Sequence, residues 1–323
     1  MFAVTAESIN PDSPLDGLGM GGHADPTVPE GWTTVEVRAA ALNYHDLWTL
    51  KGVGIKPEQL PMVLGCDAAG VDEDGNEVVV HAVIGNPDAG GGDETLDPNR
   101  SLLSEVYDGT LAERVAVPRR NLVPKPAELS WVEAACLPTA WLTAYRMLFT
   151  KSGLRPGDTV LVQGAGGGVA TALIVLAKAG GFRVWVTSRD ESKRARALEL
   201  GAHAAFESNA RLPERVDAVM ESVGEATWTH SLRSLRPGGR VVVVGATSGA
   251  NPPADLRRMF FLQLQIVGST MGTRAELTSL IALCRTADVR PVVEATYALR
   301  DARSAFKHLA SGDVFGKIVL TNP

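Results

Sequence analysis

The glycine-rich segment TVLVQGAGGGVA, residues 159–170, has the residue types and order of a site for a bound phosphate. An apolar run ends in a turn that contains Gly164, Gly166, Gly167 and Gly168, and an apolar helical pattern follows directly. Glycines let the backbone approach a phosphate closely, and the free N–H groups of a first helical turn attract the anion. A second apolar run, FRVWVTS, completes a strand–turn–helix–strand unit of the expected length. We expect a nicotinamide dinucleotide here, although such a turn can also be purely structural.

The residues after that second run indicate which dinucleotide binds. An acidic side chain at the tip of the strand would bind the ribose of NAD, whereas an arginine accommodates the 2′-phosphate of NADP. This chain has Ser188 and Arg189 at the tip, with Lys193 one helical turn later, so we expect NADP(H). Asp190 is the competing signal, and its alternative role is to cap the helix that follows.

Length and composition exclude several classes of protein. The chain has 323 residues, 45% of them hydrophobic and 21% charged, with a net charge of −6, which suits an ordinary two-domain globular protein. No basic block suggests nucleic acid or a membrane surface, and no secretory signal is visible. The three cysteines, Cys66, Cys136 and Cys284, are far apart and odd in number, so we expect reduced thiols and a cytoplasmic protein.

Residue composition and hydrophobic periodicity change along the chain. Residues 1–121 carry short strand-like runs and many glycines, prolines and aspartates, typical of an irregular, mostly β domain. From about residue 130, helical patterns alternate with continuous apolar strands, which predicts a parallel sheet covered on both faces. Two helical patterns and two short strands follow from about residue 270, and residues 85–101 have the composition of a loop.

Several stretches together resemble the medium-chain dehydrogenase/reductase superfamily, most closely its zinc-free quinone-oxidoreductase-like and enoyl-reductase-like branches. The resemblance implies an α/β fold in which a Rossmann doubly wound parallel sheet, residues 122–265, is inserted in a GroES-like mostly-β catalytic domain. That domain would consist of residues 1–121 and a return segment, 266–323. The matching stretches are AALNYHDLWTLKG (40–52), LPMVLGCDAAGV (60–71), DGTLAERVAVPRRNLVPKP (108–126), LPTAWLTAYRML (137–148), the glycine-rich turn, GGRVVVVGATSG (238–249), LQIVGS (264–269) and FGKIVL (315–320).

The same resemblance bears on a catalytic metal. Zinc-dependent members have a cysteine where this chain has Asn43, and a histidine followed by a glutamate where it has Cys66 and Asp67. An amide is a poor zinc donor, and the loop 85–104 lacks the cysteines of a structural zinc lobe. We therefore expect no metal, with a site formed by Cys66, His45 and Asp67 as the alternative.

Without a Lewis acid, oxidation of a simple alcohol is hard, whereas an enone or quinone accepts hydride because its charge spreads onto oxygen. We expect an NADPH-dependent, zinc-independent reductase of quinones or α,β-unsaturated carbonyl compounds. The alternatives are an alcohol or aldehyde dehydrogenase with a degenerate metal site, and a non-catalytic dinucleotide-binding sensor.

The resemblance also assigns individual residues. Tyr44 would be a proton donor or a packing residue, with water as a competing donor, and Asp46 would hold its loop or take part in chemistry. The implied catalytic residues are Asn43, Tyr44 and Asp46; the substrate pocket Trp48 and Cys66; and the cofactor site Thr143, Gly166, Gly167, Gly168, Val169, Ser188, Arg189, Lys193, Val223, Gly245, Ala246, Thr247, Gly316 and Lys317.

The apolar strand 262–270 lies at the end of the predicted Rossmann domain. In the family that this chain resembles, the equivalent strand pairs with its copy across a two-fold axis. Because an exposed apolar edge needs cover, we expect a homodimer through this strand, acting on a small-molecule substrate.

Overall fold

The computed structural model describes residues 1–322, which form two compact units. The first unit runs from Met1 to Leu142 and resumes at Met271, and the second is Thr143–Thr270. The sequence predicted divisions at 121/122 and 265/266, and the structure divides later at both places. Residues 122–142 stay with the first unit because α2 (Trp131–Ala135) packs on β3 and β5 of that unit. Residues after 265 stay with the second because β16 (Gln265–Gly268) extends its sheet.

The first unit is built on a seven-stranded sheet in the order β10-β6-β5-β3-β18-β17, with β9 also pairing to β3. Its long strand β3 is antiparallel to β5, β9 and β18, and alternates buried with partly exposed side chains over much of its length. The strands of this sheet are β3 (Trp32–Ala41), β5 (Ala68–Asp72), β6 (Glu77–Val80), β9 (Arg114–Pro118), β10 (Leu122–Pro124), β17 (Val293–Ala298) and β18 (Lys317–Thr321). Smaller sheets contain β1 (Phe2–Ala6), β2 (Leu18–Gly22) and β4 (Met62–Val63), and β7 (Val83–Ile84) with β8 (Ser101–Leu102).

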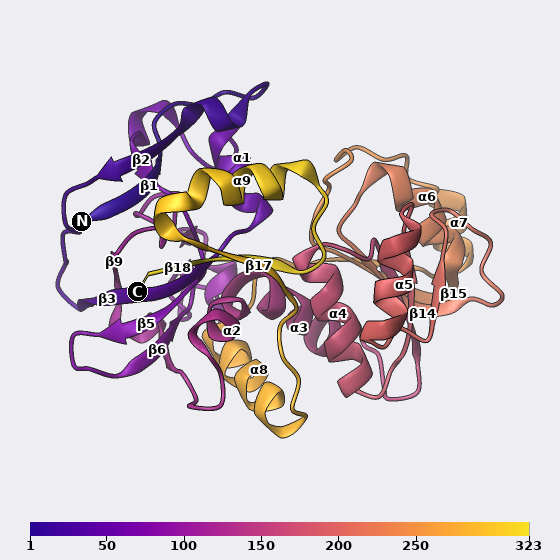
Figure 1. Cartoon of the computed structure of the whole chain (residues 1–323). Coiled ribbons are helices and arrows are strands. Elements are labelled where there is room, and N and C mark those ends of the chain that lie inside the picture. The colour runs from indigo at the N-terminus through magenta and orange to yellow at the C-terminus, as the bar shows by residue number, and fades with distance from the viewer. Residues whose placement is uncertain (323) are drawn as a thin grey trace. The chain divides into compact units, whose positions relative to one another are not determined.

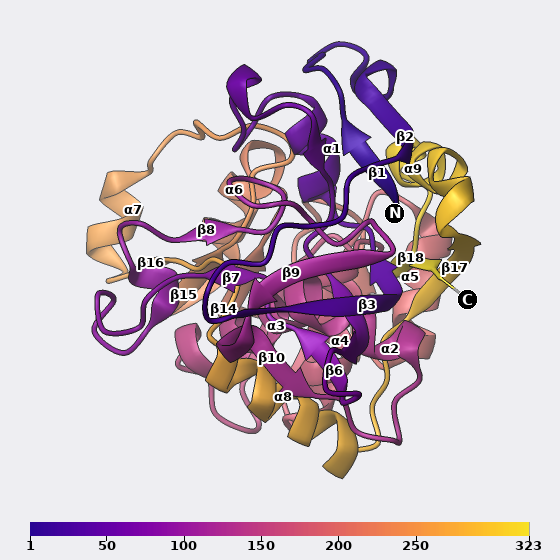
Figure 2. The ribbon, with the colours of Figure 1, turned by 90° about the vertical axis from the view of Figure 1, so that its left-hand side faces the viewer.

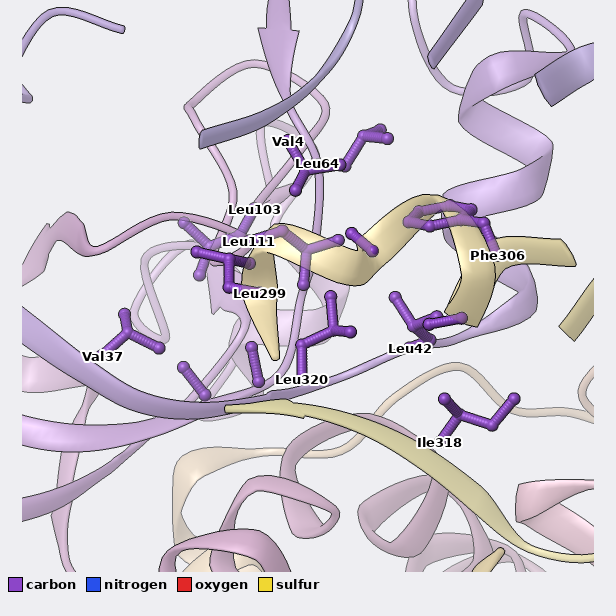
Figure 3. Packing of buried hydrophobic residues seen from close by; sticks show 14 of the residues in the cluster. Val4, Val37, Leu42, Leu64, Leu103, Leu111, Leu299, Phe306, Ile318 and Leu320 are labelled. Atoms are coloured by element: carbon purple, nitrogen blue, oxygen red, sulfur yellow. The ribbon is translucent and has the colours of Figure 1, made fainter. Parts of the chain in front are cut away.

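The end of the chain returns to the first unit and completes its core. Helix α9 (Ala302–Ser311) and strands β17 and β18, yellow in Figure 1, lie among the indigo N-terminal elements. Figure 3 shows Phe306 of α9 and Leu320 of β18 among side chains such as Leu111 from the first half of the chain. The other helices are α1 (Tyr44–Leu50), α2, and α8 (Arg274–Thr286), which lies beside β10 and the π-helical turn Leu137–Trp141 (Figure 2).

The second unit is a six-stranded, all-parallel sheet in the order β13-β12-β11-β14-β15-β16. The chain moves outward from β11 to β13, then returns to β14 on the other side of β11, which makes the β11/β14 junction the topological switch point. This is the doubly wound fold that the sequence predicted. Its elements are α3 (Leu142–Tyr145), β11 (Thr159–Gln163), α4 (Gly168–Ala179), β12 (Arg183–Thr187), α5 (Glu191–Leu200), β13 (Ala204–Phe206), β14 (Val216–Glu221), α6 (Glu225–Ser234), β15 (Leu235–Val243), α7 (Leu256–Phe261) and β16.

Replacing Phe306 with alanine should show that the return segment stabilises the first unit. Phe306 is fully buried in its core, so we expect the free energy of unfolding to fall by about 3–5 kcal/mol. Leu96→Ala is the control, because Leu96 is 60% exposed and its truncation should change stability by less than about 0.5 kcal/mol. Urea unfolding followed by circular dichroism measures both, and equal losses in the two variants would contradict this account.

Candidate active site

A buried lysine joins the two ends of the chain in the first unit. Lys317 is the first residue of β18, which runs antiparallel beside the end of β3, and its side chain is only 2% exposed. Its ammonium group donates to the main-chain oxygen of Leu42 (2.7 Å), to Oδ1 of Asn43 (2.6 Å) and to Oδ2 of Asp67 (3.1 Å). An ammonium has three N–H groups, so these partners use all of them.

This contact fixes the orientation of the Asn43 amide. Lys317 can only donate, so the oxygen of the amide faces it and the nitrogen faces away. Nδ2 of Asn43 donates to Oδ2 of Asp67 (2.9 Å) and, over a longer distance, to the oxygen of Ala41 (3.3 Å). Asn43 is buried, with 8% of its surface exposed, and its bond to Ala41 is the longer of its two donated hydrogen bonds.

Asp46 belongs to the same buried group but serves the backbone. Its Oδ2 accepts the N–H of Asn43 (2.8 Å) at the start of α1, and the side chain is fully buried. Burial raises the pKa of Asp46 to about 6, an effect that the nearby His45 ring and the Asn43 N–H oppose. The burial of this carboxylate and its bond to the backbone favour the role of Asp46 in holding the loop, which was one of its two predicted roles.

Cys66 and His45 form a second polar group with Glu105, a residue of the loop region that the sequence analysis did not select. The ring of His45 lies between the Cys66 sulfur (Nδ1, 3.4 Å) and the Glu105 carboxylate (Nε2, 3.2 Å). Burial disfavours a charged ring, but Cys66 and Glu105 outweigh it and hold the pKa of His45 well above its ordinary value. Burial raises the pKa of the Cys66 thiol, which donates to the oxygen of Leu103 (3.1 Å).

The position of Cys66 corrects its assignment to a substrate pocket. The residue is 0% exposed and packs against Ala82, Val83 and Met271, so its sulfur does not line an open surface of this unit. The two aromatic residues predicted nearby remain accessible. Tyr44 is 45% exposed, its hydroxyl has no hydrogen-bond partner within residues 1–322, and Trp48 is partly buried under the ammonium of Lys51.

In the second unit, the glycine-rich turn has the geometry expected of a phosphate site. Gly164 leaves β11 at φ +84°, a left-handed conformation that favours glycine, and α4 begins at Gly168. Gly167 precedes α4 without any side-chain cap, and a Cβ added there would meet no atom within 4 Å. The first N–H groups of the helix therefore lie beside open space, with Val169 in the first turn.

The residues at the tip of β12 suit the 2′-phosphate of NADP better than the free ribose 2′-hydroxyl of NAD. Asp190 accepts the N–H groups of Ser192 (2.8 Å) and Lys193 (3.2 Å) at the start of α5, and hydrogen bonding from Ser192 lowers the pKa of its carboxyl. This is the capping role that the sequence offered as the alternative for Asp190. Ser188 lies at the end of the strand, and Arg189 beside it is exposed.

The other predicted cofactor segments follow neighbouring strands at the same edge of the sheet. Glu221, which the sequence analysis did not select, ends β14; its carboxylate accepts the N–H groups of Val223 (2.8 Å) and Gly224 (3.0 Å). The turn after β15 lies against this one: Thr247 Oγ1 donates to Ser222 O (3.5 Å). Gly245 and Ala246 belong to the same turn. Only the acidic residue at the end of an apolar strand could have indicated Glu221 from the sequence.

The remaining predictions fall in different places. Thr143, in α3, is buried and opens the second unit, whereas Gly316 and Lys317 belong to the first. Gly316 has φ +113°, and a Cβ there would collide with the Val292 oxygen, so this position needs glycine. The ammonium of Lys317 binds Leu42, Asn43 and Asp67 and so supports Asn43; its contact with the cofactor stays a prediction.

Comparisons with known proteins agree with this architecture. A family model described as alcohol dehydrogenase GroES-like domain matches residues 29–127, and one described as zinc-binding dehydrogenase matches residues 168–286. The chain is 31% identical over 318 residues to acryloyl-coenzyme A reductase of Metallosphaera sedula, covering 92% of this chain and 94% of the relative. Among solved structures, an NAD-dependent alcohol dehydrogenase is similar with a TM-score of 0.91 and 33% identity, covering both chains fully. The 2-octenoyl-CoA carboxylase reductase CinF, solved with NADP and 2-octenoyl-CoA, has a TM-score of 0.92 and 25% identity over 99% of this chain and 87% of its own.

One of those descriptions implies zinc, and the residues of this chain do not fit it. The oxygen of Asn43 and one oxygen of Asp67 bind an ammonium, and the thiol of Cys66 donates to the main-chain oxygen of Leu103 (3.1 Å). In the alternative set, Cys66 and His45 are in contact (3.4 Å), but Asp67 does not join them, because its carboxylate faces Lys317 and Asn43. Within residues 1–322, no three histidine, cysteine or acidic side chains are grouped to hold a metal ion.

The family of this chain follows from its two units, the order of their strands and the two matching family models. The matched ranges cover most of the chain and correspond to the two parts of a single enzyme fold. The chain belongs to the medium-chain dehydrogenase/reductase superfamily.

Proposed function

We propose that this protein is an NADPH-dependent reductase of carbon–carbon double bonds conjugated to a carbonyl group, with α,β-unsaturated thioesters and enones as its substrate class. The observation that carries the proposal is the group formed by Asn43, Asp67 and Lys317. At the position where zinc-dependent relatives bind a Lewis acid, it presents an oriented amide. An amide gives the substrate oxygen a hydrogen bond, which is sufficient help only if the substrate itself spreads the negative charge.

Reduction of a conjugated double bond can proceed with a single hydrogen bond from an amide to the carbonyl oxygen. NADPH, when bound, would supply the hydride for the β-carbon, so that the electron pair of the double bond would move toward the carbonyl oxygen. Nδ2 of Asn43 is the donor that this chain offers to that oxygen, by giving up its long bond to Ala41 (3.3 Å). The α-carbon then takes a proton, for which the unpartnered hydroxyl of Tyr44 is the accessible source in this segment, with water as the competitor.

Two similarities support this substrate class. The relative from Metallosphaera sedula is an acryloyl-coenzyme A reductase, and CinF was solved with an unsaturated acyl-CoA. Quinones share the same electronics and form the second part of the proposed range. The competing function is alcohol oxidation, which the similarity to an NAD-dependent alcohol dehydrogenase favours.

For the cofactor, NADPH is favoured over NADH because Asp190, the acid directly after Arg189, caps α5. Exposed Arg189 beside Ser188 provides the cation for a 2′-phosphate. We also propose a cytoplasmic location, since Cys66, Cys136 and Cys284 are all buried and unpaired. Among the helices of residues 1–322, none has the length and apolarity needed to cross a bilayer.

The proposed homodimer would form through the outer edge of the second unit. β16 is the last strand of its sheet, so one of its edges has no partner strand within the described residues, and Ile266 on it is 40% exposed. The neighbouring α7 exposes Leu256 (67%), Phe260 (72%) and Phe261 (77%). A second copy that pairs along β16 would give the backbone N–H and C=O groups of this edge hydrogen-bond partners and would cover the apolar surface.

A substrate panel tests the reaction class. With NADPH, we expect turnover of crotonyl-CoA and of a simple enone at rates well above those for aldehydes, and no oxidation of primary alcohols with NADP⁺. NADPH deuterated at C4 should place deuterium on the β-carbon of the product, as detected by NMR. Preferential oxidation of alcohols would instead establish the competing function.

Replacing Arg189 with alanine tests the cofactor assignment. The loss of a charge-assisted contact to the 2′-phosphate should weaken NADPH binding by about 10- to 100-fold and leave NADH binding unchanged. Asp190→Ser keeps a capping side chain and serves as the control, with both affinities unchanged. Fluorescence titration measures the dissociation constants. Weaker NADH binding in the Asp190 variant, with normal NADPH binding in the Arg189 variant, would reverse the assignment.

A charge placed on the edge strand tests the dimer. We expect the wild-type protein to sediment at twice the 34.2 kDa of the chain, and Ile266→Arg to sediment as a monomer because a buried, unpaired charge opposes strand pairing. Leu198→Arg, at a residue 47% exposed on α5, is the control and should leave the mass unchanged. Analytical ultracentrifugation at micromolar concentration decides, and a monomeric wild type would rule out this interface.

A further inference from the structure

The ammonium of Lys317 binds side chains at or beside the positions of the zinc ligands in zinc-dependent relatives. Two of its three acceptors are Oδ1 of Asn43 (2.6 Å) and Oδ2 of Asp67 (3.1 Å). Asn43 stands at the position of a zinc ligand in zinc-dependent relatives, and Asp67 directly follows the position of another. The cation is covalently attached to the chain, is 2% exposed and has every N–H group committed.

A divalent ion and this ammonium exclude each other. A metal bound by Asn43 and Asp67 would lie within a few ångströms of a positive charge that has no exit to solvent. Like charges at such separations repel each other, so the ammonium opposes the binding of a divalent ion. The other oxygen of Asp67 is buried without a hydrogen-bond partner, so the carboxylate relies on Lys317 and Asn43 for its stabilisation.

We infer that Lys317 is this protein's built-in substitute for the catalytic metal: its ammonium keeps a divalent cation out and holds and polarises the Asn43 amide. Because Oδ1 accepts from a cation, electron density is drawn from the amide nitrogen and Nδ2–H becomes a stronger donor. Lys317 has no free N–H for a substrate and is therefore a positioning residue that acts through Asn43. The catalytic part of this inference rests on the proposed function, whereas the exclusion of metal does not.

Cobalt binding tests the exclusion of metal without any substrate. In Lys317→Met, the oxygens of Asn43 and Asp67 lose their cation, and we expect Co²⁺ to bind at least about tenfold more tightly than in the wild type. Lys125→Met is the matched control, because Lys125 is also a shielded lysine of the first unit, paired with Glu77 (2.8 Å), and should bind cobalt as the wild type does. Visible absorption and elemental analysis after dialysis measure the metal. Equal cobalt affinity in the wild type and Lys317→Met would overturn the inference.

Kinetics test the positioning role. Lys317→Met leaves Asp67 buried without its counter-charge and should unfold at a lower temperature, so Lys317→Met/Asp67→Asn removes both charges to preserve the fold. For this double variant we expect kcat with a conjugated carbonyl to fall about 10- to 100-fold, with the KM for NADPH within about twofold of the wild-type value. Lys317→Arg keeps the charge and should recover part of kcat. A folded double variant with wild-type kcat would overturn the role of Lys317. A wild type that reduces no conjugated carbonyl would refute the proposed function and leave the cobalt result to decide the metal question.

Discussion

A buried ammonium must be surrounded by acceptors, and in this protein those acceptors come from segments far apart in the sequence. Lys317 is 250 residues from Asp67 and 274 from Asn43, yet its ammonium binds both side chains. The contact requires β18 to lie beside β3, and this pairing in turn places the return segment with Phe306 in the core of the first unit. The pairing of β18 with β3 therefore serves both the apolar core of the first unit and the grouping of Lys317 with Asn43 and Asp67.

In the second unit, all strands are parallel, so their carboxyl ends lie at the same edge of the sheet. Gln163 pairs with Thr187, and Glu221 with Val243, so the turns after these strands emerge side by side. Two acids at this edge are used by the backbone: Asp190 caps α5, and Glu221 accepts the N–H groups of its own turn. The edge is consequently left with open helix N–H groups and an exposed arginine, the composition that suits a phosphate-rich ligand.

The sequence was sufficient where the signal is local and insufficient where contacts are long-range. The strand–turn–helix order around Gly167 and the capping pattern at Asp190 depend on neighbouring residues, and the structure has both features as the sequence indicated. The partner of Asn43 could not be predicted, because nothing near residue 43 indicates a lysine 274 residues away. For the same reason, Cys66 was placed in a pocket although residues from three other segments bury it, and Glu105 was overlooked although it holds the ring of His45. The unit boundaries shifted because α2 and β16 take their place by packing and strand pairing, which local patterns do not encode.

Replacing a metal with an ammonium restricts the chemistry as well as the composition of the site. A metal ion offers an open coordination position to the substrate, but the three N–H groups of Lys317 are fully used, so its charge reaches the substrate only through the amide of Asn43. A hydrogen bond from an amide stabilises a developing oxyanion far less than direct ligation does. A substrate whose own conjugation spreads the negative charge needs less help of this kind, and this is the physical basis for the proposed reduction of conjugated carbonyl compounds.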